Sequence, residues 1–270
     1  MKRSEINQII EYTINALRRE KFPLPPFAYY GIEEWKNLSD DEAEIVENML
    51  GWDITDFGSG DFRKIGLTIF TFRNGNFHMK EKYPKPYAEK MLYVLDGQVL
   101  PFHYHWNKRE DIINRGGGKL EIVLHNSTTE DFEDINGMIM HRKGTFAGTP
   151  VKVSVDGKTV VVEDGGSVIL EPGQSISLSP GQYHQWKGVP GTGDIILFEV
   201  STTNDDTVDN RFYDAGERIP GIEEDVPAQY LIFADYPKFT KIKGGNDGSR
   251  EERSNCDFPR SFRSGVGKVQ

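Results

Sequence analysis

The spacing of hydrophobic residues changes near residue 66, and this change separates a helical part of the chain from a β part. In the first part, apolar side chains recur every three or four residues over two stretches: Ile6, Ile9, Ile10, Ile14 and Leu17, then Ala43, Val46, Met49 and Leu50. This spacing places each set on one face of a helix. Ser4 is the expected N-cap of the first helix, and Ser39 with Glu42 forms a capping box for the second. We expect both helices to pack outside a β core.

Between residues 66 and 200, short apolar segments alternate with turn residues. The expected strands cover residues 67–72, 90–95, 119–125, 151–155, 159–162, 167–170, 174–178 and 194–200. Turn pairs of the kind that join antiparallel strands stand at Asn74–Gly75, Asp96–Gly97 and Asp156–Gly157. This pattern predicts an all-β sandwich or barrel, of which the jelly roll is one form. We divide the chain into a helical cover (1–60), a β-barrel domain (61–240) and an extended tail (241–270).

Composition and charge narrow the classes of partner. The net charge of −10 argues against nucleic acid, because an acidic surface repels the phosphate backbone. The single cysteine, Cys256, has no second cysteine in the chain with which to form a disulfide. The N-terminal residues are polar and amphipathic rather than a signal core, and no run of 18 apolar residues occurs. We therefore expect a cytoplasmic protein without a membrane segment.

The segment from Gly97 to Gly117 carries the most specific chemical signal. His103 and His105 are two residues apart, so on a strand they share a face and lie about 6–7 Å apart. Glu110 follows after a short bend. The spacing of these residues between Gly97 and Gly117 matches the first cupin motif. The resemblance predicts a cupin jelly-roll barrel.

A second segment fits the second cupin motif, which brings a later histidine from a neighbouring strand. Gly173, Gly181 and His184 keep the expected offsets, whereas Pro180 stands one place late and no Asn follows His184 at four residues. Together the two motifs predict metal ligation by His103, His105, Glu110 and His184. Three imidazoles and a carboxylate suit Mn, Fe, Co, Ni or Zn better than Ca. For the other histidines, His78, His125 and His141, we expect surface or ordinary hydrogen-bonding roles.

Several further segments resemble the bacterial D-lyxose isomerase family of sugar isomerases. They are residues 24–28 (LPPFA), 87–90 (YAEK), 103–118 (HYHWNKREDIINRGGG), 199–201 (EVS), 204–206 (NDD), 209–210 (DN) and 227–229 (PAQ). The resemblance spans roughly residues 4 to 237. It implies a manganese-dependent homodimer that interconverts D-lyxose with D-xylulose, and often D-mannose with D-fructose. Co²⁺, Fe²⁺ or Zn²⁺ remain alternatives for the metal.

Aldose–ketose isomerisation needs groups that move a proton between C1 and C2 through an enediol, and Lys and Glu can both do so. Lys108 lies between the expected metal ligands in the sequence, so we predict that it is catalytic. The family resemblance suggests an acid as its partner, and we predict that this acid is Glu217. We predict substrate contacts for Lys90, Glu199, Asp209 and Arg218. Glu199 shares a strand face with Ile195 and Leu197 and is the second choice as the catalytic acid.

Two other classes of function stay open at this point. A cupin dioxygenase uses a similar site with a redox-active metal and consumes O₂. A non-catalytic sugar-binding cupin binds its ligand without turnover. The polar side chains predicted around the metal favour catalysis over storage only modestly.

Overall fold

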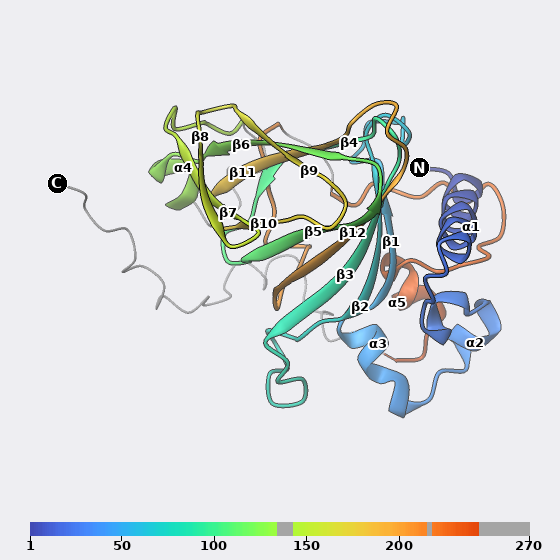
Figure 1. Cartoon of the computed structure of the whole chain (residues 1–270). Helices are drawn as coiled ribbons and strands as arrows, with labels where there is room; N and C mark the ends of the chain where they lie inside the picture. The colour runs from blue at the N-terminus through green and yellow to red at the C-terminus, as the bar shows by residue number, and fades with distance from the viewer. Residues whose placement is uncertain (134–142, 215–217, 243–270) are drawn as a thin grey trace.

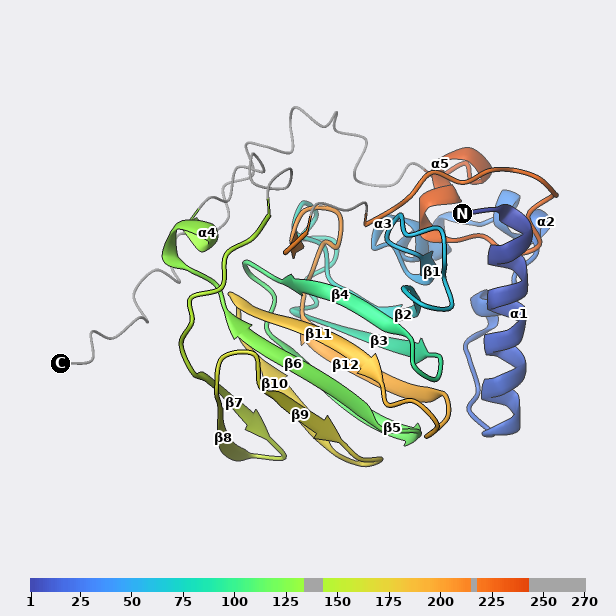
Figure 2. The ribbon, with the colours of Figure 1, turned by 90° about the horizontal axis from the view of Figure 1, so that it is seen from above.

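Two antiparallel β-sheets face each other and enclose the core, and most of the helices lie outside the larger sheet (Figure 1, Figure 2). The computed structural model describes residues 1–133, 143–214 and 218–242. This arrangement confirms the predicted all-β jelly-roll barrel with N-terminal helices packed outside it.

The larger sheet has eight strands in the order β1-β2-β3-β12-β5-β10-β7-β8. Their bounds are Gly51–Thr55 (β1), Leu67–Arg73 (β2), Tyr87–Val94 (β3), Glu110–Gly117 (β5), Val151–Val155 (β7), Lys158–Val162 (β8), Ser175–Leu178 (β10) and Ile195–Thr202 (β12). The smaller sheet has five strands in the order β13-β4-β11-β6-β9. Their bounds are Val99–Tyr104 (β4), Leu120–Asn126 (β6), Ser167–Leu170 (β9), Gln182–Gly188 (β11) and Arg211–Phe212 (β13).

The helices are short except for the first. They are α1 (Arg3–Arg19), α2 (Ile32–Lys36), α3 (Ala43–Glu47), α4 (Thr129–Glu133) and α5 (Tyr236–Phe239), with 3-10 turns at Pro26–Tyr29, Asp40–Glu42 and Phe233–Asp235. Figure 1 shows α1, α2, α3 and α5 beside β1 and β2, away from the interior of the barrel. In the part of the chain that the structure describes, no helix is long and apolar enough to cross a membrane.

Strand alternation builds two separate hydrophobic cores. On β12, Leu197 faces the barrel interior, where it joins residues of both sheets such as Ile122 and Trp186. Its neighbours Ile196 and Phe198 face outward and belong to a second core, which the apolar side of α1 completes. This alternation also directs Glu199, two residues after Leu197, into the barrel.

Three local predictions differ from the structure. The N-cap of α1 is Lys2 and not Ser4, because the carboxylate of Asp225 accepts both the backbone N–H and the hydroxyl of Ser4. The second predicted helix is broken into a 3-10 turn and α3, although the Glu42 carboxylate does accept from Ser39 as the capping box requires. Residues 51–55, which we assigned to the helical cover, form strand β1.

Candidate active site

Two strands of the smaller sheet bring three histidines together. His103 on β4 is paired in register with His184 on β11, and His105 follows directly after the end of β4. All three side chains are buried, and each offers a ring nitrogen within 4.8 Å of the others. The predicted i and i+2 spacing therefore does place His103 and His105 on one side, opposite a histidine from far along the chain.

Backbone carbonyls fix the proton of each imidazole on Nδ1. Carbonyl oxygens only accept, so the Nδ1–H of His103 donates to Pro101 (3.0 Å) and that of His184 donates to Gln182 (3.0 Å). The Nδ1–H of His105 donates to the carbonyl of Asp209 at 2.6 Å. This leaves the Nε2 lone pair of each ring free to bind a metal ion, as in metal sites generally.

Glu110, the first residue of β5, completes the group. Its Oε1 lies 3.1 Å from His184 Nε2, and its Oε2 lies 3.6 Å from His105 Nε2. Both of these Nε2 atoms and Glu110 Oε1 are buried without a hydrogen-bond partner among the described residues. Buried acceptors without donors are costly unless something else satisfies them. A divalent metal ion fits this donor set, which is three imidazoles and one carboxylate.

The electrostatics keep His103 and His105 in the neutral form that binds metal. Burial lowers the pKa of His103 well below its usual value, and the neighbouring His184 and His105 lower it further. Burial, followed by the Lys108 ammonium, lowers the pKa of His105 to about 3. Burial opposes the ionisation of Glu110, but the Lys108 ammonium outweighs it, so the pKa of Glu110 is lowered well below normal.

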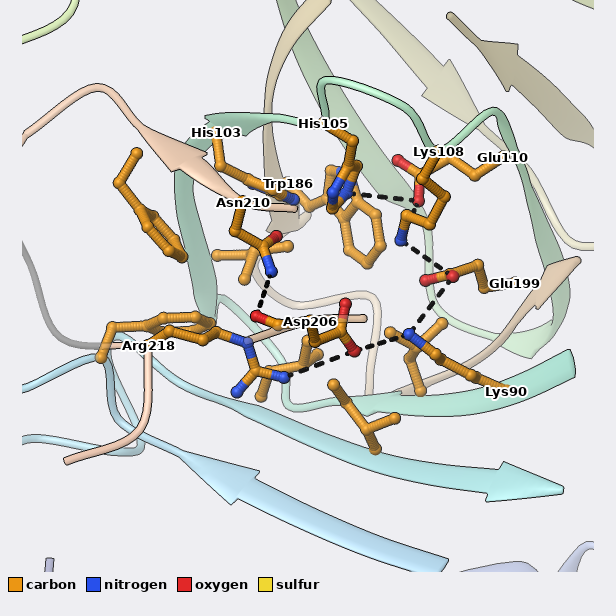
Figure 3. A pocket seen from close by; sticks show the side chains of 16 residues that line it. Lys90, His103, His105, Lys108, Glu110, Trp186, Glu199, Asp206, Asn210 and Arg218 are labelled. Carbon is orange, nitrogen blue, oxygen red and sulfur yellow. Dashed lines mark hydrogen bonds and ion pairs between the residues drawn. The ribbon is translucent and has the colours of Figure 1, made fainter. Parts of the chain in front are cut away.

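A chain of ion pairs leads from Glu110 across the pocket (Figure 3). Lys108 Nζ lies 2.7 Å from Glu110 Oε2 and 2.9 Å from Glu199 Oε1. Lys90 Nζ lies 3.5 Å from the same Glu199 oxygen and 2.6 Å from Asp206 Oδ2. Arg218 lies 3.8 Å from that Asp206 oxygen. Acids and bases therefore alternate from one end of the pocket to the other.

These contacts set the charge of each group. Burial alone lowers the pKa of Lys108, but the Glu110 and Glu199 carboxylates outweigh it, so the pKa is raised. For Asp206, burial opposes ionisation but Lys90, Lys108 and Arg218 outweigh it, so the pKa is lowered. Lys108 is thus a proton donor at neutral pH and Asp206 is a carboxylate. The apolar walls of the pocket include Phe57, Trp186 and Phe212, the last two on the smaller sheet.

Comparisons with known proteins place the chain in a family. Residues 1–236 match the sequence model of the family described as D-lyxose isomerase. The chain belongs to the D-lyxose isomerase family. The D-lyxose/D-mannose isomerase of Serratia proteamaculans is 43% identical over 240 residues, which cover 88% of this chain and 99% of that protein. The D-lyxose/D-mannose isomerase of Escherichia coli O157:H7 is 41% identical over 246 residues, covering 88% of this chain and 100% of that one. The resemblance inferred from the sequence is confirmed, and with it the assignment to the sugar isomerases.

Solved structures of L-ribose isomerases have a fold similar to that of this chain. The L-ribose isomerase of Cellulomonas parahominis superposes with a TM-score of 0.53 at 14% identity, and that of Geodermatophilus obscurus with 0.53 at 16% identity. Each alignment covers 83% of this chain and 98% of the other. At such low identity the likeness concerns the fold alone.

The structure brings most of the site residues predicted for this chain into one pocket. Lys90, Lys108, Glu199 and Arg218 all line it, together with His103, His105 and Glu110. Asp209 does not line it: its carboxylate accepts backbone N–H groups of the loop that follows β4. Burial raises the pKa of Asp209 to about 6 despite these N–H donors.

The remaining candidates have other outcomes. Glu217 lies outside the described residues, as does His141. His125 is half-buried and has an ordinary hydrogen-bonding role, as expected: its Nδ1 lies 2.8 Å from Asp164 and its ring stacks on Phe146.

Sequence reasoning missed two acidic residues of the pocket region. Asp206 was not assigned to the site, because its partners Lys90 and Arg218 are distant in the sequence. Asp53 pairs with Arg218 and could not be found because its strand, β1, was not predicted. The Asn204-Asp-Asp206 segment of the family resemblance was the available signal for Asp206.

Proposed function

We propose that this enzyme interconverts D-lyxose with D-xylulose and D-mannose with D-fructose, by 1,2-proton transfer with a bound divalent metal ion. The observation that carries the proposal is the convergence of three proton-free Nε2 atoms and the Glu110 carboxylate beside the buried Lys108–Glu199 pair. Both relatives compared above are named as isomerases of these two aldoses.

His103, His105, His184 and Glu110 would hold the ion, and we propose Mn²⁺, with Co²⁺, Fe²⁺ or Zn²⁺ as substitutes. When bound, the ion supplies Lewis-acid polarisation of the sugar carbonyl, which makes the neighbouring C–H more acidic. The ligands are of intermediate softness, which favours these metals over Ca²⁺.

The protein groups beside the ligands would move the protons. Isomerisation transfers one proton between C1 and C2 and a second between O1 and O2. Lys108 is protonated and deeply buried, so it is placed to donate to a substrate oxygen. Glu199 is the carboxylate nearest to Lys108 apart from the ligand Glu110, so we now prefer it as the base for the carbon-bound proton. Glu217 stays the alternative suggested by the family resemblance.

The opposite end of the pocket would bind the rest of the sugar. Lys90, Asp206 and Arg218 offer both donors and acceptors, which suits the hydroxyl groups of an open-chain sugar. Among the described residues at this end of the pocket, Lys90 and Arg218 already face the Asp206 carboxylate, so these side chains offer no surplus positive charge that would favour a phosphorylated sugar.

We also propose a cytoplasmic homodimer, on the basis of the family resemblance and the single cysteine of the chain. Sedimentation at several protein concentrations tests the dimer independently of activity. A monomer at all concentrations would remove this part of the proposal and leave the reaction untouched.

Incubation of the Mn²⁺-loaded protein with a panel of aldoses and ketoses tests the reaction. We expect turnover of D-lyxose and D-mannose, with solvent deuterium incorporated at C1 of the ketose when the reaction runs in deuterated water. Turnover without any incorporation would point to a hydride shift. Consumption of O₂ with a redox-active metal would instead support a cupin dioxygenase.

A further inference from the structure

Asp209 packs against the loop between β4 and β5 and forms hydrogen bonds with four consecutive residues, 105–108. Its Oδ1 accepts the backbone N–H of Trp106 (2.9 Å) and of Asn107 (3.0 Å), and its Oδ2 accepts that of Lys108 (2.9 Å). Its own carbonyl oxygen accepts the Nδ1–H of His105 at 2.6 Å. Asp209 is 1% exposed, so these contacts replace water almost completely.

These four loop residues include two groups on which the proposed reaction depends. His105 must direct Nε2 toward Glu110, and Lys108 must reach both Glu110 and Glu199. A loop has many accessible backbone conformations, and holding one of them costs about 1–2 kcal/mol of entropy per residue. Three N–H groups that converge on one buried carboxylate hold the loop by charge-assisted hydrogen bonds, which are about twice as strong as neutral ones.

The contact between Asp209 and His105 has a second effect. A carbonyl that accepts from Nδ1 fixes both the tautomer and the rotation of the ring, which determines where Nε2 points. For His103 and His184 the accepting carbonyl lies only two residues earlier in the same strand. For His105 it comes from residue 209, so the orientation of this ligand depends on the distant loop that carries Asp209.

We propose that Asp209 is a positioning residue that sets residues 105–108 in the metal-binding arrangement before the ion binds. It acts through His105 and Lys108 and touches neither the substrate nor the ion. This inference rests on the metal site proposed above, and it replaces the substrate contact that the sequence suggested for Asp209.

The variant Asp209→Asn tests the inference because it keeps the size of the side chain and removes one acceptor oxygen. The amide group then faces an N–H donor of the loop. We expect the dissociation constant for Mn²⁺ and for Co²⁺ to rise about 10- to 100-fold, the usual effect of losing a partner of a metal ligand. The visible absorption spectrum of the Co²⁺ protein should change, and at saturating metal kcat should fall more than KM rises.

Asp235→Asn is the matched control. Asp235 is also a fully buried carboxylate with a backbone N–H partner, Ile232, but it pairs with Arg3 on the outer side of the larger sheet. This variant should lose stability while its metal dissociation constant stays within twofold of the wild-type value. If Asp209→Asn behaves in the same way and keeps the wild-type Co²⁺ spectrum, Asp209 is merely structural and the inference is wrong. If the wild-type protein itself binds no divalent metal, the proposed metal site fails instead.

Hydrogen exchange on the wild-type protein gives a test that needs no folded variant. The amides of Trp106, Asn107 and Lys108 should be protected in the metal-free protein nearly as well as in the Mn²⁺-loaded protein, because Asp209 already holds them. Fast exchange of these three amides without metal, with protection only after Mn²⁺ is added, would show that the ion and not Asp209 orders the loop.

Discussion

At the scale of single residues, Lys108 allows metal binding and catalysis to be separated. Its ammonium contacts Glu110 and Glu199, but a cation does not bind a metal ion. We expect Lys108→Ala to retain its metal and to lose about 100- to 10,000-fold in kcat, the usual range for a general acid–base group. Elemental analysis and steady-state kinetics measure the two properties on the same sample.

The control for this variant is Lys119→Ala, which removes a half-exposed lysine that pairs with Glu171 on the surface. It should leave both kcat and metal content near the wild-type values. A Lys108→Ala protein with near-normal kcat would exclude Lys108 from the proton transfers.

The choice between Glu199 and Glu217 is a second question at this scale. Glu199 is buried beside Lys108 and Lys90. The substitution Glu199→Gln removes its charge and changes its volume little. We expect this variant to lose about 100- to 10,000-fold in kcat and to slow deuterium incorporation to the same extent. Glu217→Gln should have a much smaller effect. If Glu217→Gln instead lost more kcat than Glu199→Gln, Glu217 would be the catalytic residue.

The sequence could predict those site residues whose spacing is short. His103, His105, Lys108 and Glu110 lie within eight positions, so their spacing in the sequence was enough to group them. The network beyond them joins partners such as Lys90 and Asp206, which are 116 positions apart. Only the pairing of the strands decides such contacts. For the same reason Asp209 was assigned to the substrate, because its backbone N–H partners cannot be read from a pattern of side chains.

At the scale of secondary-structure elements, one buried ion pair connects α1 to the end of the described chain. Both terminal nitrogens of Arg3 donate to Asp235, at 2.8 and 2.7 Å, and both side chains are fully buried. Glu224 accepts from the same guanidinium at 2.8 Å. The side of the helix that carries Arg3 therefore has a polar anchor next to its apolar core contacts.

We expect Arg3→Ala to lower the free energy of unfolding by about 3–5 kcal/mol, because Asp235 would remain buried without its partner. Urea denaturation followed by circular dichroism measures the change. The exposed pair of Lys36 with Glu33 provides the control, since Lys36→Ala should cost less than 1 kcal/mol. A loss below 1 kcal/mol for Arg3→Ala would mean that Asp235 finds another partner or water.

Helices and strands were predicted well where hydrophobic residues recur at a regular spacing. They were predicted poorly where contacts with distant parts of the chain determine whether an element forms and where it begins. The strand around Leu197 alternates inward and outward residues and was predicted to within a few positions. Strand β1 is buried on both faces, so Trp52 and Asp53 give no alternation to detect. The first turn of α1 lacks its predicted Ser4 cap because Asp225, more than 200 residues away, satisfies the backbone instead.

At the scale of the whole molecule, the buried charged groups predict how acid affects the metal-free protein. His105 has a folded pKa of about 3, against about 6.5 when unfolded, so below pH 6.5 the unfolded chain binds more protons. His103 shifts in the same direction. Stability should therefore fall as the pH decreases from 6.5, by up to about 1.4 kcal/mol per pH unit for each histidine. The lowered pKa values of Glu110 and Asp206 extend the loss below pH 4.

Urea midpoints measured between pH 8 and pH 4 in a chelator check this expectation. Replacing His105 by Gln should make the urea midpoint depend less steeply on pH between pH 6.5 and 4, because the side chain at this position no longer gains a proton on unfolding. A slope that is unchanged in the variant would assign the acid sensitivity to other groups.

The metal ion should reverse much of this sensitivity, because it binds the folded protein through groups that converge only after both sheets have formed. The proposed ligands come from β4, the loop after it, β5 and β11, so the unfolded chain offers no comparable site. An ion present at about 1,000 times its dissociation constant stabilises the folded state by about 4 kcal/mol. For a chain of this length that corresponds to a rise of roughly 10 °C in Tm.

We expect this rise with Mn²⁺ after dialysis against a chelator, and little or none with Ca²⁺, which the three imidazoles bind poorly. His184→Ala should show no rise at the same Mn²⁺ concentration, since it lacks one ligand. Equal Tm values for the wild-type protein with chelator and with Mn²⁺ would leave the buried Nε2 atoms of His105 and His184 without an explanation as metal ligands.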